Sequence, residues 1–451
     1  MANEYANLAP EVISLRDRYL NHETTIGVVG LGYVGLPLVR TLTRKGYKTV
    51  GFDVDVSKVE SLKSGKSYIR HIPDAEIAEI NSRGLFQATT NFELVSDVDA
   101  VLICVPTPLN RYREPDMSYV VGTTEAIAPY VKAGQLVVLE STTYPGTTDE
   151  VMRPILEAGG LRSGVDLYLA YSPEREDPGN PQYETATIPK VVGGDGEAAL
   201  ALAQALYGEI VAGVVPVAST ATAEAVKLTE NIFRSVNIAL VNELKVVYEK
   251  MGIDIWEVID AAKSKPFGFM PFYPGPGLGG HCIPIDPFYL TWKAREFDVA
   301  TRFIELAGEI NTAMPEHVVR RVAETLDRRF AKGLNGSKLL LMGMAYKKNV
   351  DDMRESPSLV LIEMLQERGA EVDYHDPYVP KIMRTREHPE LSGMRSVSLT
   401  PDSIAAYDAV LVSTDHDDVD YDTLVANARL VVDTRNATKA VSANRDKIVK
   451  A

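Results

Sequence analysis

Cysteine is scarce in this chain of 451 residues, occurring only at Cys104 and Cys282. Two cysteines cannot build a disulfide framework or a cysteine-rich metal site, so the fold must depend on its hydrophobic core. We therefore expect no metal ion, and the composition leaves room for one reactive thiol.

Long hydrophobic runs and an excess of basic residues are also lacking. No stretch approaches the roughly 18 to 20 consecutive apolar residues of a membrane-spanning helix, and residues 1–23 are polar and acidic, unlike a signal peptide. We expect a cytoplasmic protein with reduced thiols and no membrane partner. Lysine and arginine number 47 against 62 aspartates and glutamates, a net charge of −15, which argues against nucleic acid as a partner.

The chain does have length and a regular alternation of patterns. At roughly 150 residues per domain, it is long enough for about three domains. In the first half, short apolar runs alternate with helical patterns, which indicates a parallel, doubly wound sheet. The predicted strands are residues 25–31, 48–55, 99–106, 135–142, 166–173 and 189–194.

A different pattern begins near Ser219. Apolar residues at helical spacing predict one long helix that Ser219 or Thr220 caps and Gly252 ends. From about residue 337, strand and helix alternate again, and residues 408–414 echo residues 99–105. We predict an α/β protein with two Rossmann-like, doubly wound parallel sheets joined by a central helical domain. The expected domains are residues 1–218, 219–325 and 326–451.

Gly30, Gly32 and Gly35 form a GxGxxG turn between the first predicted strand and a helix. The first glycine permits a tight turn, the second lets the backbone approach a pyrophosphate, and the third lets helix and strand pack closely. Asp53, at the end of the next strand, would accept hydrogen bonds from a ribose diol. Without a ligand, the motif would be only a glycine-rich turn. Strand, helix and acid in register favour a dinucleotide, and the lack of an arginine beside Asp53 favours NAD over NADP.

Cys282 follows a stretch with four glycines between residues 275 and 280, and His281 and Asp286 flank it. Open, glycine-rich backbone can aim N–H groups at a developing oxyanion and admit a bulky substrate. The local residues leave two interpretations, a nucleophilic thiol or a buried structural cysteine. Cys104 lies inside an apolar run and is expected to be structural.

Lys227 and Asn231 share one face of the predicted long helix, and Glu174 follows a predicted strand. By themselves, these residues indicate no more than a solvated helix face and a loop carboxylate.

Taken together, these segments resemble the nucleotide-sugar 6-dehydrogenases, the family that includes UDP-glucose dehydrogenase. The resemblance covers nearly the whole chain in order and is closest to the branch that acts on UDP-N-acetylglucosamine. UDP-glucose enzymes usually have serine where His281 stands, and Pro178 replaces a second carboxylate of the family, whose role does not carry over. The matching blocks are GVVGLGYVGLPL, VPTP, ESTTYPGTT, YSPEREDPGN, KLTEN, GLGGHCIPID and AYKKNVDDMRES.

The resemblance implies a four-electron oxidation of a sugar C6 hydroxymethyl group to a carboxylate, with two NAD⁺ consumed. Cys282 would be the nucleophile, forming first a thiohemiacetal and then a thioester that water hydrolyses.

Other site residues are also implied by the resemblance. Lys227 would stabilise the C6 oxygen, with Asn231 beside it. Asp286 and Glu174 would act as general bases, and Thr142 would help to position a water molecule.

The resemblance further implies two binding surfaces and a homodimer through the central helices. The family more often has arginine at the Lys58 position. The cations Lys227, Lys347, Arg354 and Arg435 are predicted to line one pocket for the nucleotide-sugar diphosphate. The residues implied for NAD are Gly30, Gly32, Tyr33, Val34, Gly35, Asp53, Lys58, Thr107, Ser141, Thr142 and Arg354. Those implied for the nucleotide sugar are Glu174, Lys227, Asn231, Phe272, Tyr273, Gly277, Gly279, Lys347 and Arg435.

Three alternatives stay open on the sequence. The same reaction on UDP-glucose, or on dTDP-glucose in antibiotic-sugar synthesis, would need only small changes in the pocket. A two-electron 3-hydroxyacid dehydrogenase would need neither the thiol nor the third domain. A catalytically silent nucleotide-sugar binding protein would not need Cys282, Lys227 and Asp286.

Overall fold

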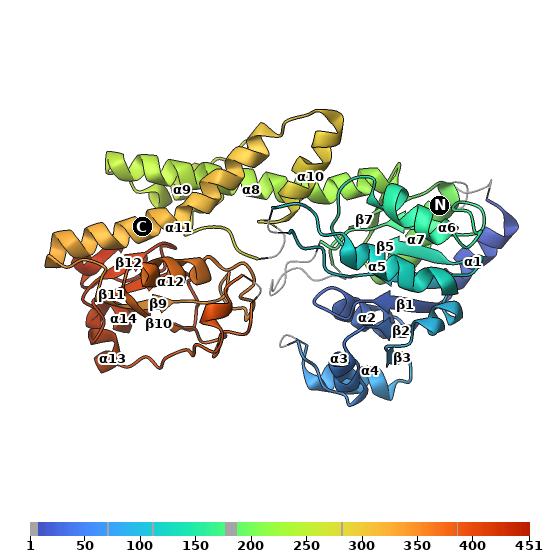
Figure 1. Cartoon of the computed structure of the whole chain (residues 1–451), viewed down its shortest axis with the longest axis horizontal. Coiled ribbons are helices and arrows are strands. Elements are labelled where there is room, and N and C mark those ends of the chain that lie inside the picture. The colour runs from blue at the N-terminus through green and yellow to red at the C-terminus, as the bar shows by residue number, and fades with distance from the viewer. Residues whose placement is uncertain (1–7, 70–71, 111, 176–186, 281–282, 386) are drawn as a thin grey trace. The chain divides into compact units, whose positions relative to one another are not determined.

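The structure is a computed structural model that describes residues 8–69, 72–110, 112–175, 187–280, 283–385 and 387–451. The chain forms two compact units: residues up to 230 with 288–299, and residues 231–287 with 300–451. Each unit contains an open α/β sheet with its own hydrophobic core (Figure 1). The predicted fold class is confirmed, and the three domain boundaries stay predictions.

The first unit contains an eight-stranded sheet in the order β3-β2-β1-β4-β5-β6-β7-β8. The order reverses between β1 and β4, as in a doubly wound sheet. The strands are β1 (Thr25–Val29), β2 (Lys48–Phe52), β3 (Phe86–Thr89), β4 (Ala100–Ile103), β5 (Leu136–Leu139), β6 (Tyr168–Tyr171), β7 (Lys190–Gly194) and β8 (Val214–Val217).

One strand pair departs from the predicted parallel arrangement. β7 runs antiparallel to β6, with Ala170 opposite Gly194 and Tyr171 opposite Gly193. Parallel neighbours need a crossover connection, which is usually a helix. Residues 172–189 include four prolines, so this connection is poorly suited to a crossover helix.

Two apolar clusters cover the two faces of this sheet. Val28 belongs to one cluster and the adjacent Val29 to the other, as the alternation of side chains along a strand requires. The helices of this unit are α1 (Pro10–Leu20), α2 (Gly35–Arg44), α3 (Val56–Lys63), α4 (Asp74–Ser82), α5 (Ser118–Ile127), α6 (Arg153–Glu157) and α7 (Glu197–Ile210). Short helical turns are η1 (Phe92–Asp97), η2 (Ala128–Tyr130) and the π-helical η3 (Thr147–Met152).

The long helix α8 (Thr220–Met251) has 32 residues and extends through the boundary of the two units. The Ser219 hydroxyl accepts from the Thr222 N–H at 3.1 Å, and Gly252 has φ +73°, so the predicted cap and end are confirmed. The helices that follow are α9 (Ile255–Ala262), α10 (Asp286–Ala294) and α11 (Arg302–Phe330), with the turn η4 (Arg295–Phe297). None of the helices in the described ranges is long and apolar enough to cross a membrane.

The second unit contains a five-stranded parallel sheet in the order β10-β9-β11-β12-β13. The sequence echo has a structural counterpart, because β4 pairs with β1 just as β11 pairs with β9. The strands are β9 (Lys338–Met342), β10 (Glu371–His375), β11 (Ala409–Val412), β12 (Val431–Asp433) and β13 (Ile448–Lys450). The helices are α12 (Pro357–Glu367), α13 (Pro401–Ala405) and α14 (Tyr421–Asn427), with the turns η5 (Pro389–Leu391) and η6 (Arg445–Lys447).

Candidate active site

The GxGxxG turn joins β1 to α2, as the sequence predicts. Gly30 has φ +91°, and a Cβ on Gly35 would lie 1.9 Å from the Gly30 carbonyl oxygen, so both positions need glycine. Apart from chain neighbours, no described heavy atom lies within 4 Å of the place a Gly32 Cβ would take. Tyr33 and Val34 pack against the core, and no described side chain caps the start of α2. The turn therefore presents open backbone and helix N–H groups, which fit a pyrophosphate.

Asp53 follows β2 and is 6% exposed. Its Oδ2 accepts from the Leu31 N–H inside the glycine turn at 2.9 Å and pairs with the Lys58 ammonium at 3.1 Å. Its Oδ1 accepts from the Asp55 N–H at 2.9 Å. The carboxylate thus holds the turn in shape, and its use for a ribose diol stays a prediction. The sequence did not predict these contacts of Asp53, although the resemblance assigned Asp53 and Lys58 to the same cofactor site.

Thr107 and Ser141 are buried in the loops that follow β4 and β5. The Ser141 hydroxyl donates to the Val105 carbonyl at 2.7 Å, which ties the two loops together. Thr142 is partly exposed beside Ser141. Because β1, β4 and β5 are parallel neighbours, these loops and the glycine turn lie at one edge of the sheet.

Glu224 on α8 is a fully buried residue that sequence reasoning did not assign. Its carboxylate accepts from the Gly146 N–H at 2.6 Å and from the N–H and hydroxyl of Thr148 at 2.9 and 2.8 Å. Burial raises the pKa of Glu224 to about 7, against the three hydrogen bonds that favour its ionised form. The contacts attach η3, and with it the loop that carries Thr142, to the first turns of α8.

Glu174 follows β6 at the same edge of the sheet. Its Oε1 accepts from the Arg175 N–H at 2.7 Å, and its Oε2 lies 3.4 Å from the ammonium of the buried Lys190. The Arg175 guanidinium pairs with Glu230 of α8 at 2.6 Å. Glu174 is therefore held in a charged, partly buried setting rather than in a solvated loop.

Lys227 and Asn231 on α8 are 7% and 3% exposed, so they are not on a solvated helix face. The Asn231 Nδ2 donates to the Asp286 Oδ2 at 2.5 Å, and Asp286 is 1% exposed at the start of α10. Burying three polar side chains costs free energy unless they are hydrogen-bonded, and the hydrogen bond between Asn231 and Asp286 offsets part of that cost. The structure brings Asn231 and Asp286 together, and their roles stay predictions.

The glycine loop at residues 272–280 belongs to the second unit. Phe272 packs edge-on against Phe233 at 5.7 Å between ring centroids, and Tyr273 stacks on Trp256 at 5.5 Å. The Gly275 N–H donates to the buried Asn242 at 3.0 Å. These contacts anchor the start of the loop to α8 and α9.

The rest of the loop packs against segments of the second sheet. A Cβ on Gly279 would lie 2.7 Å from Tyr346, and one on Gly277 would lie 3.2 Å from Pro357. The Gly280 N–H donates to the Arg354 carbonyl at 3.1 Å, and the Arg354 side chain pairs with Asp352 at 2.6 Å. The Lys347 ammonium lies 5.9 Å from the centre of the Tyr346 ring.

Arg435 lies directly against the same loop. A Cβ on Gly275 would lie 2.4 Å from its Nη1, and its Nε donates to the Ser413 carbonyl at 3.0 Å. Burial lowers the pKa of Arg435, although Asp415 and Asp433 oppose the shift. Lys347, Arg354 and Arg435 therefore lie on segments that flank one loop. Lys227 belongs to the first unit, so the pocket of four cations stays a prediction.

Lys245 on α8 is a second residue that no motif revealed. It is 4% exposed, and its ammonium has no hydrogen-bond partner among the described residues. Burial lowers its pKa to about 8 against the opposing charges of Glu249 and Asp433.

The two cysteines differ in what the structure says of them. Cys104 is buried after β4, and burial raises the pKa of its thiol, which fits the structural role expected for it. Cys282 and the preceding His281 lie outside the described residues. Within the described ranges, no group of three or more histidines, cysteines, aspartates and glutamates could hold a metal ion.

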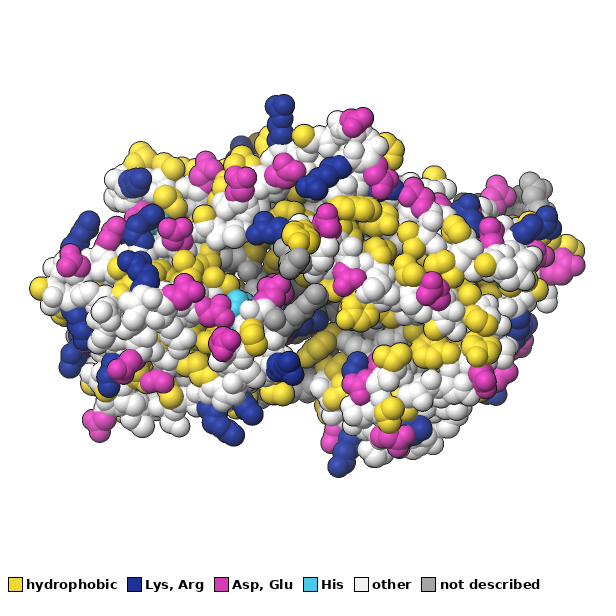
Figure 2. Space-filling view, in the orientation of Figure 1, with side chains coloured by type: hydrophobic (Ala, Val, Ile, Leu, Met, Phe, Trp, Pro, Cys, Tyr) yellow, Lys and Arg dark blue, Asp and Glu magenta, His cyan; other side chains and the backbone are white. Residues whose placement is uncertain are grey.

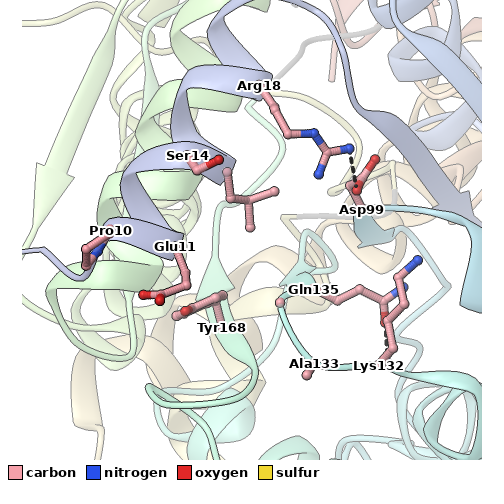
Figure 3. A pocket seen from close by; sticks show the side chains of 11 residues that line it. Pro10, Glu11, Ser14, Arg18, Asp99, Lys132, Ala133, Gln135 and Tyr168 are labelled. Atoms are coloured by element: carbon pink, nitrogen blue, oxygen red, sulfur yellow. Dashed lines mark hydrogen bonds and ion pairs between the residues drawn. The ribbon is translucent and has the colours of Figure 1, made fainter.

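Charges of both signs are interspersed on the face that Figure 2 shows, so the excess of acid is not gathered there. A pocket of 620 Å³ lies at the amino ends of β4, β5 and β6, the edge opposite the glycine turn (Figure 3). Its Arg18 pairs with Asp99 at 2.9 Å, and its Gln135 donates to the carbonyls of Val95 and Val98. Contacts within the fold already engage these polar groups, so they do not indicate a ligand site.

Comparison with known proteins agrees with this geometry. Residues 24–211, 221–313 and 340–440 match the NAD binding, central and UDP binding domains of the UDP-glucose/GDP-mannose dehydrogenase family. The chain is 36% identical over 393 residues to UDP-N-acetyl-D-glucosamine 6-dehydrogenase of Pseudomonas aeruginosa, covering 87% of this chain and 90% of that protein. It is 35% identical to UDP-N-acetyl-D-mannosamine dehydrogenase of Methanococcus maripaludis, covering 91% and 92%. The solved structure of UDP-D-ManNAc dehydrogenase from Pyrococcus horikoshii superposes with a TM-score of 0.84 at 32% identity, covering 94% and 98%.

The chain therefore belongs to the UDP-glucose/GDP-mannose dehydrogenase family. It is an oxidoreductase that uses NAD and acts on a nucleotide sugar, so the predicted class of enzyme and the predicted cofactor are confirmed.

Proposed function

We propose that this enzyme oxidises the C6 hydroxymethyl group of a UDP-N-acetylhexosamine, UDP-N-acetylglucosamine in the first place, to the carboxylate. The observation that carries the proposal is the buried pair of Asn231 and Asp286, with Lys227 one helical turn away on α8. Such a group has the hydrogen-bonding and acid–base character that an alcohol oxidation needs.

NAD, when bound, accepts the two electrons of each oxidation step. In the proposal, the backbone of the glycine turn holds its pyrophosphate and Asp53 accepts from its adenosine ribose. Tyr33, Val34, Lys58, Thr107, Ser141 and Arg354 complete this side of the site. The open Gly32 backbone, the uncapped start of α2 and the placement of Asp53 fit this use.

The chemistry at C6 divides between bases and a nucleophile. Glu174 or Asp286 takes the alcohol proton, directly or through a water held by Thr142, while Lys227 and Asn231 stabilise the charge on the C6 oxygen. The Cys282 thiolate adds to the aldehyde and gives a thiohemiacetal, whose oxidation leaves a thioester. Water cleaves the thioester and returns the thiol. The whole reaction consumes one alcohol, one water and two NAD⁺, and it yields one carboxylate, two NADH and three protons.

The second unit supplies the substrate side of the proposal. The backbone between Phe272 and Gly279 receives the sugar and diphosphate, and Lys347 and Arg435 neutralise the diphosphate charge. Placement of both cations on segments beside the same loop supports this role.

The choice of sugar is tested with a panel of substrates. We expect NADH release to be fastest with UDP-N-acetylglucosamine among UDP-GlcNAc, UDP-ManNAc, UDP-GalNAc, UDP-glucose and dTDP-glucose. Faster turnover of UDP-ManNAc, UDP-GalNAc, UDP-glucose or dTDP-glucose would reassign the substrate and leave the reaction in place. No NADH from any of them would contradict the proposed function.

The mechanism at the thiol has its own test. A Cys282→Ala variant should bind the UDP-sugar with nearly normal affinity and lose steady-state production of the uronic acid. If this variant formed the acid at the normal rate, the covalent steps would be wrong.

The proposal includes a homodimer through the central helices. Phe233, Leu240 and Val247 on α8 are 47%, 52% and 44% exposed, and their spacing of seven residues places them in one stripe along the helix. On α11, Phe303 and Leu306 are also exposed. Apolar residues in such a stripe are typical of a surface that a second helix covers.

A further inference from the structure

A buried charged cluster lies beneath the carboxyl ends of β5 and β6. Glu140 follows β5, Lys190 begins β7 and Tyr207 lies on α7, and all three are nine-tenths or more buried. The Lys190 ammonium lies 2.6 Å from the Glu140 Oε2, and the Tyr207 hydroxyl donates to the Glu140 Oε1 at 2.5 Å. The same ammonium lies 3.4 Å from the Glu174 Oε2.

A buried charged cluster of this kind is weak evidence for a purely stabilising role. A buried ion pair usually costs as much in desolvation as it returns in attraction, and apolar residues of similar size are often at least as stable. The strands around the cluster are otherwise apolar: the side chains of β4, β5 and β6 are buried throughout. We therefore relate this charged cluster to the carboxylate that it contacts, that of Glu174.

Glu140 and Glu174 share one ammonium, and burial raises the pKa of Glu140 against the opposing effects of Lys190 and Tyr207. Although burial disfavours a charged amine, Glu140 and Glu174 together hold the pKa of Lys190 above its ordinary value, so the ammonium is present. The Glu140 Oε2 contacts one side of this ammonium, and the Tyr207 hydroxyl donates to the other oxygen of the Glu140 carboxylate. Glu174 receives the remaining side at a longer distance.

We propose that Lys190 is a positioning residue: held by Glu140, its ammonium keeps Glu174 ionised and oriented to remove the alcohol proton. The inference rests on the proposed role of Glu174 as a general base. Nothing in it requires Lys190 to touch the substrate.

The other groups that face Glu174 are consistent with this role. From its own loop, the Arg175 N–H donates to Glu174 Oε1, while the Arg175 guanidinium is engaged by Glu230. From β4, the Cys104 thiol stays neutral because burial raises its pKa. Lys190 is thus a cation in contact with the second carboxylate oxygen of Glu174.

The test uses the full-length enzyme and the pH dependence of kcat/KM, read from NADH release. Glu140→Gln combined with Lys190→Met removes both charges of the pair, so that no lone buried charge remains to unfold the protein. The acidic limb of the profile should move upward, because the ammonium 3.4 Å from Glu174 is the charge in direct contact with that carboxylate, and its loss outweighs the opposing loss of the Glu140 charge behind it. At a pH on the wild-type acidic limb, kcat/KM should fall.

Two further variants are controls in which the acidic limb should not move upward. Glu140→Gln alone leaves the ammonium to Glu174, so the limb should stay or move downward. Lys190→Arg keeps a cation in place, and its limb should lie near that of the wild type. A merely structural role for Lys190 would reduce activity at every pH and leave the limb where it was.

If the double variant folds and its acidic limb does not move, the inference is wrong. If the double variant does not fold, a Lys190→Arg limb that moves as far as one pH unit would overturn it instead. Glu174→Gln separates this failure from failure of the proposed function. If the Glu174→Gln enzyme has normal turnover, Glu174 is not part of the mechanism. If the Glu174→Gln enzyme is inactive but the acidic limb of the double variant does not move, only the role of Lys190 is refuted.

Discussion

Replacing Asn231 by aspartate should make the stability of this enzyme depend steeply on pH. The change would set two carboxyl groups side by side, because the Asn231 Nδ2 lies 2.5 Å from the Asp286 Oδ2 and both residues are at most 3% exposed. Two unit charges about 3 Å apart repel by about 5 kcal/mol at an effective dielectric of about 20. Taking up a proton at pH 7 on a group with an ordinary pKa of about 3.9 costs about 4 kcal/mol. The pair should therefore bind a proton.

The sign of the effect follows from proton binding. Between about pH 4 and pH 7, the folded Asn231→Asp protein would hold one more proton than the unfolded chain, so its stability falls as pH rises. We expect a loss of about 4 kcal/mol at pH 7 that shrinks by about 1.4 kcal/mol for each pH unit of acidification.

Urea unfolding at pH 5, 6 and 7, followed by tryptophan fluorescence, measures this loss. Trp292 lies on α10, the helix that Asp286 begins, and so reports on the affected region. Asn231→Leu is the control: it removes a hydrogen bond to a charged group and should cost about 2 kcal/mol with little change over this pH range. A deficit in Asn231→Asp that is the same at pH 5 and pH 7 would refute the reasoning.

Three more variants test separate parts of the account. Asp53→Asn should raise the KM for NAD about tenfold in initial-rate measurements, because it weakens the acceptor for Leu31 N–H and the ribose; an unchanged KM would remove Asp53 from the cofactor site. Lys245→Met should raise the free energy of unfolding at pH 7 by about 3 kcal/mol, because the pKa of Lys245 in the folded protein, about 8, lies below its value in the unfolded chain. This gain should disappear above about pH 10, where the lysine is neutral in both states. A loss of stability at pH 7 would show instead that the fold stabilises the ammonium. Leu240→Glu should convert the proposed dimer to monomers in light scattering, and a dimer of unaltered mass would place the dimer surface elsewhere.

Much of the fold is readable from the sequence because its signals are local. The apolar runs predict the strands of the first sheet, and the GxGxxG spacing predicts the turn between β1 and α2. Ser219 and Gly252 mark the ends of α8, since capping depends on a few neighbouring residues. The direction of β7 was not predictable in this way, because it depends on how a long connection returns to the sheet.

The site is less readable because its contacts join distant positions. Asn231 and Asp286 are 55 residues apart, and nothing in the sequence indicated the hydrogen bond between them. Lys190 lies 50 residues from Glu140, and their pairing depends on the order of β5, β6 and β7. Lys245 carries no motif at all, and only its burial without a partner among the described residues marks it.

The central claim is a four-electron oxidation, and the yield of NADH tests it most directly. UDP-N-acetylglucosamine is supplied in limiting amount with excess NAD⁺, and the reaction is followed to completion by absorbance while the nucleotide sugars are separated and quantified. The account predicts two NADH and one UDP-uronic acid for each sugar consumed. One NADH per sugar, with an aldehyde or ketone as the product, would contradict it.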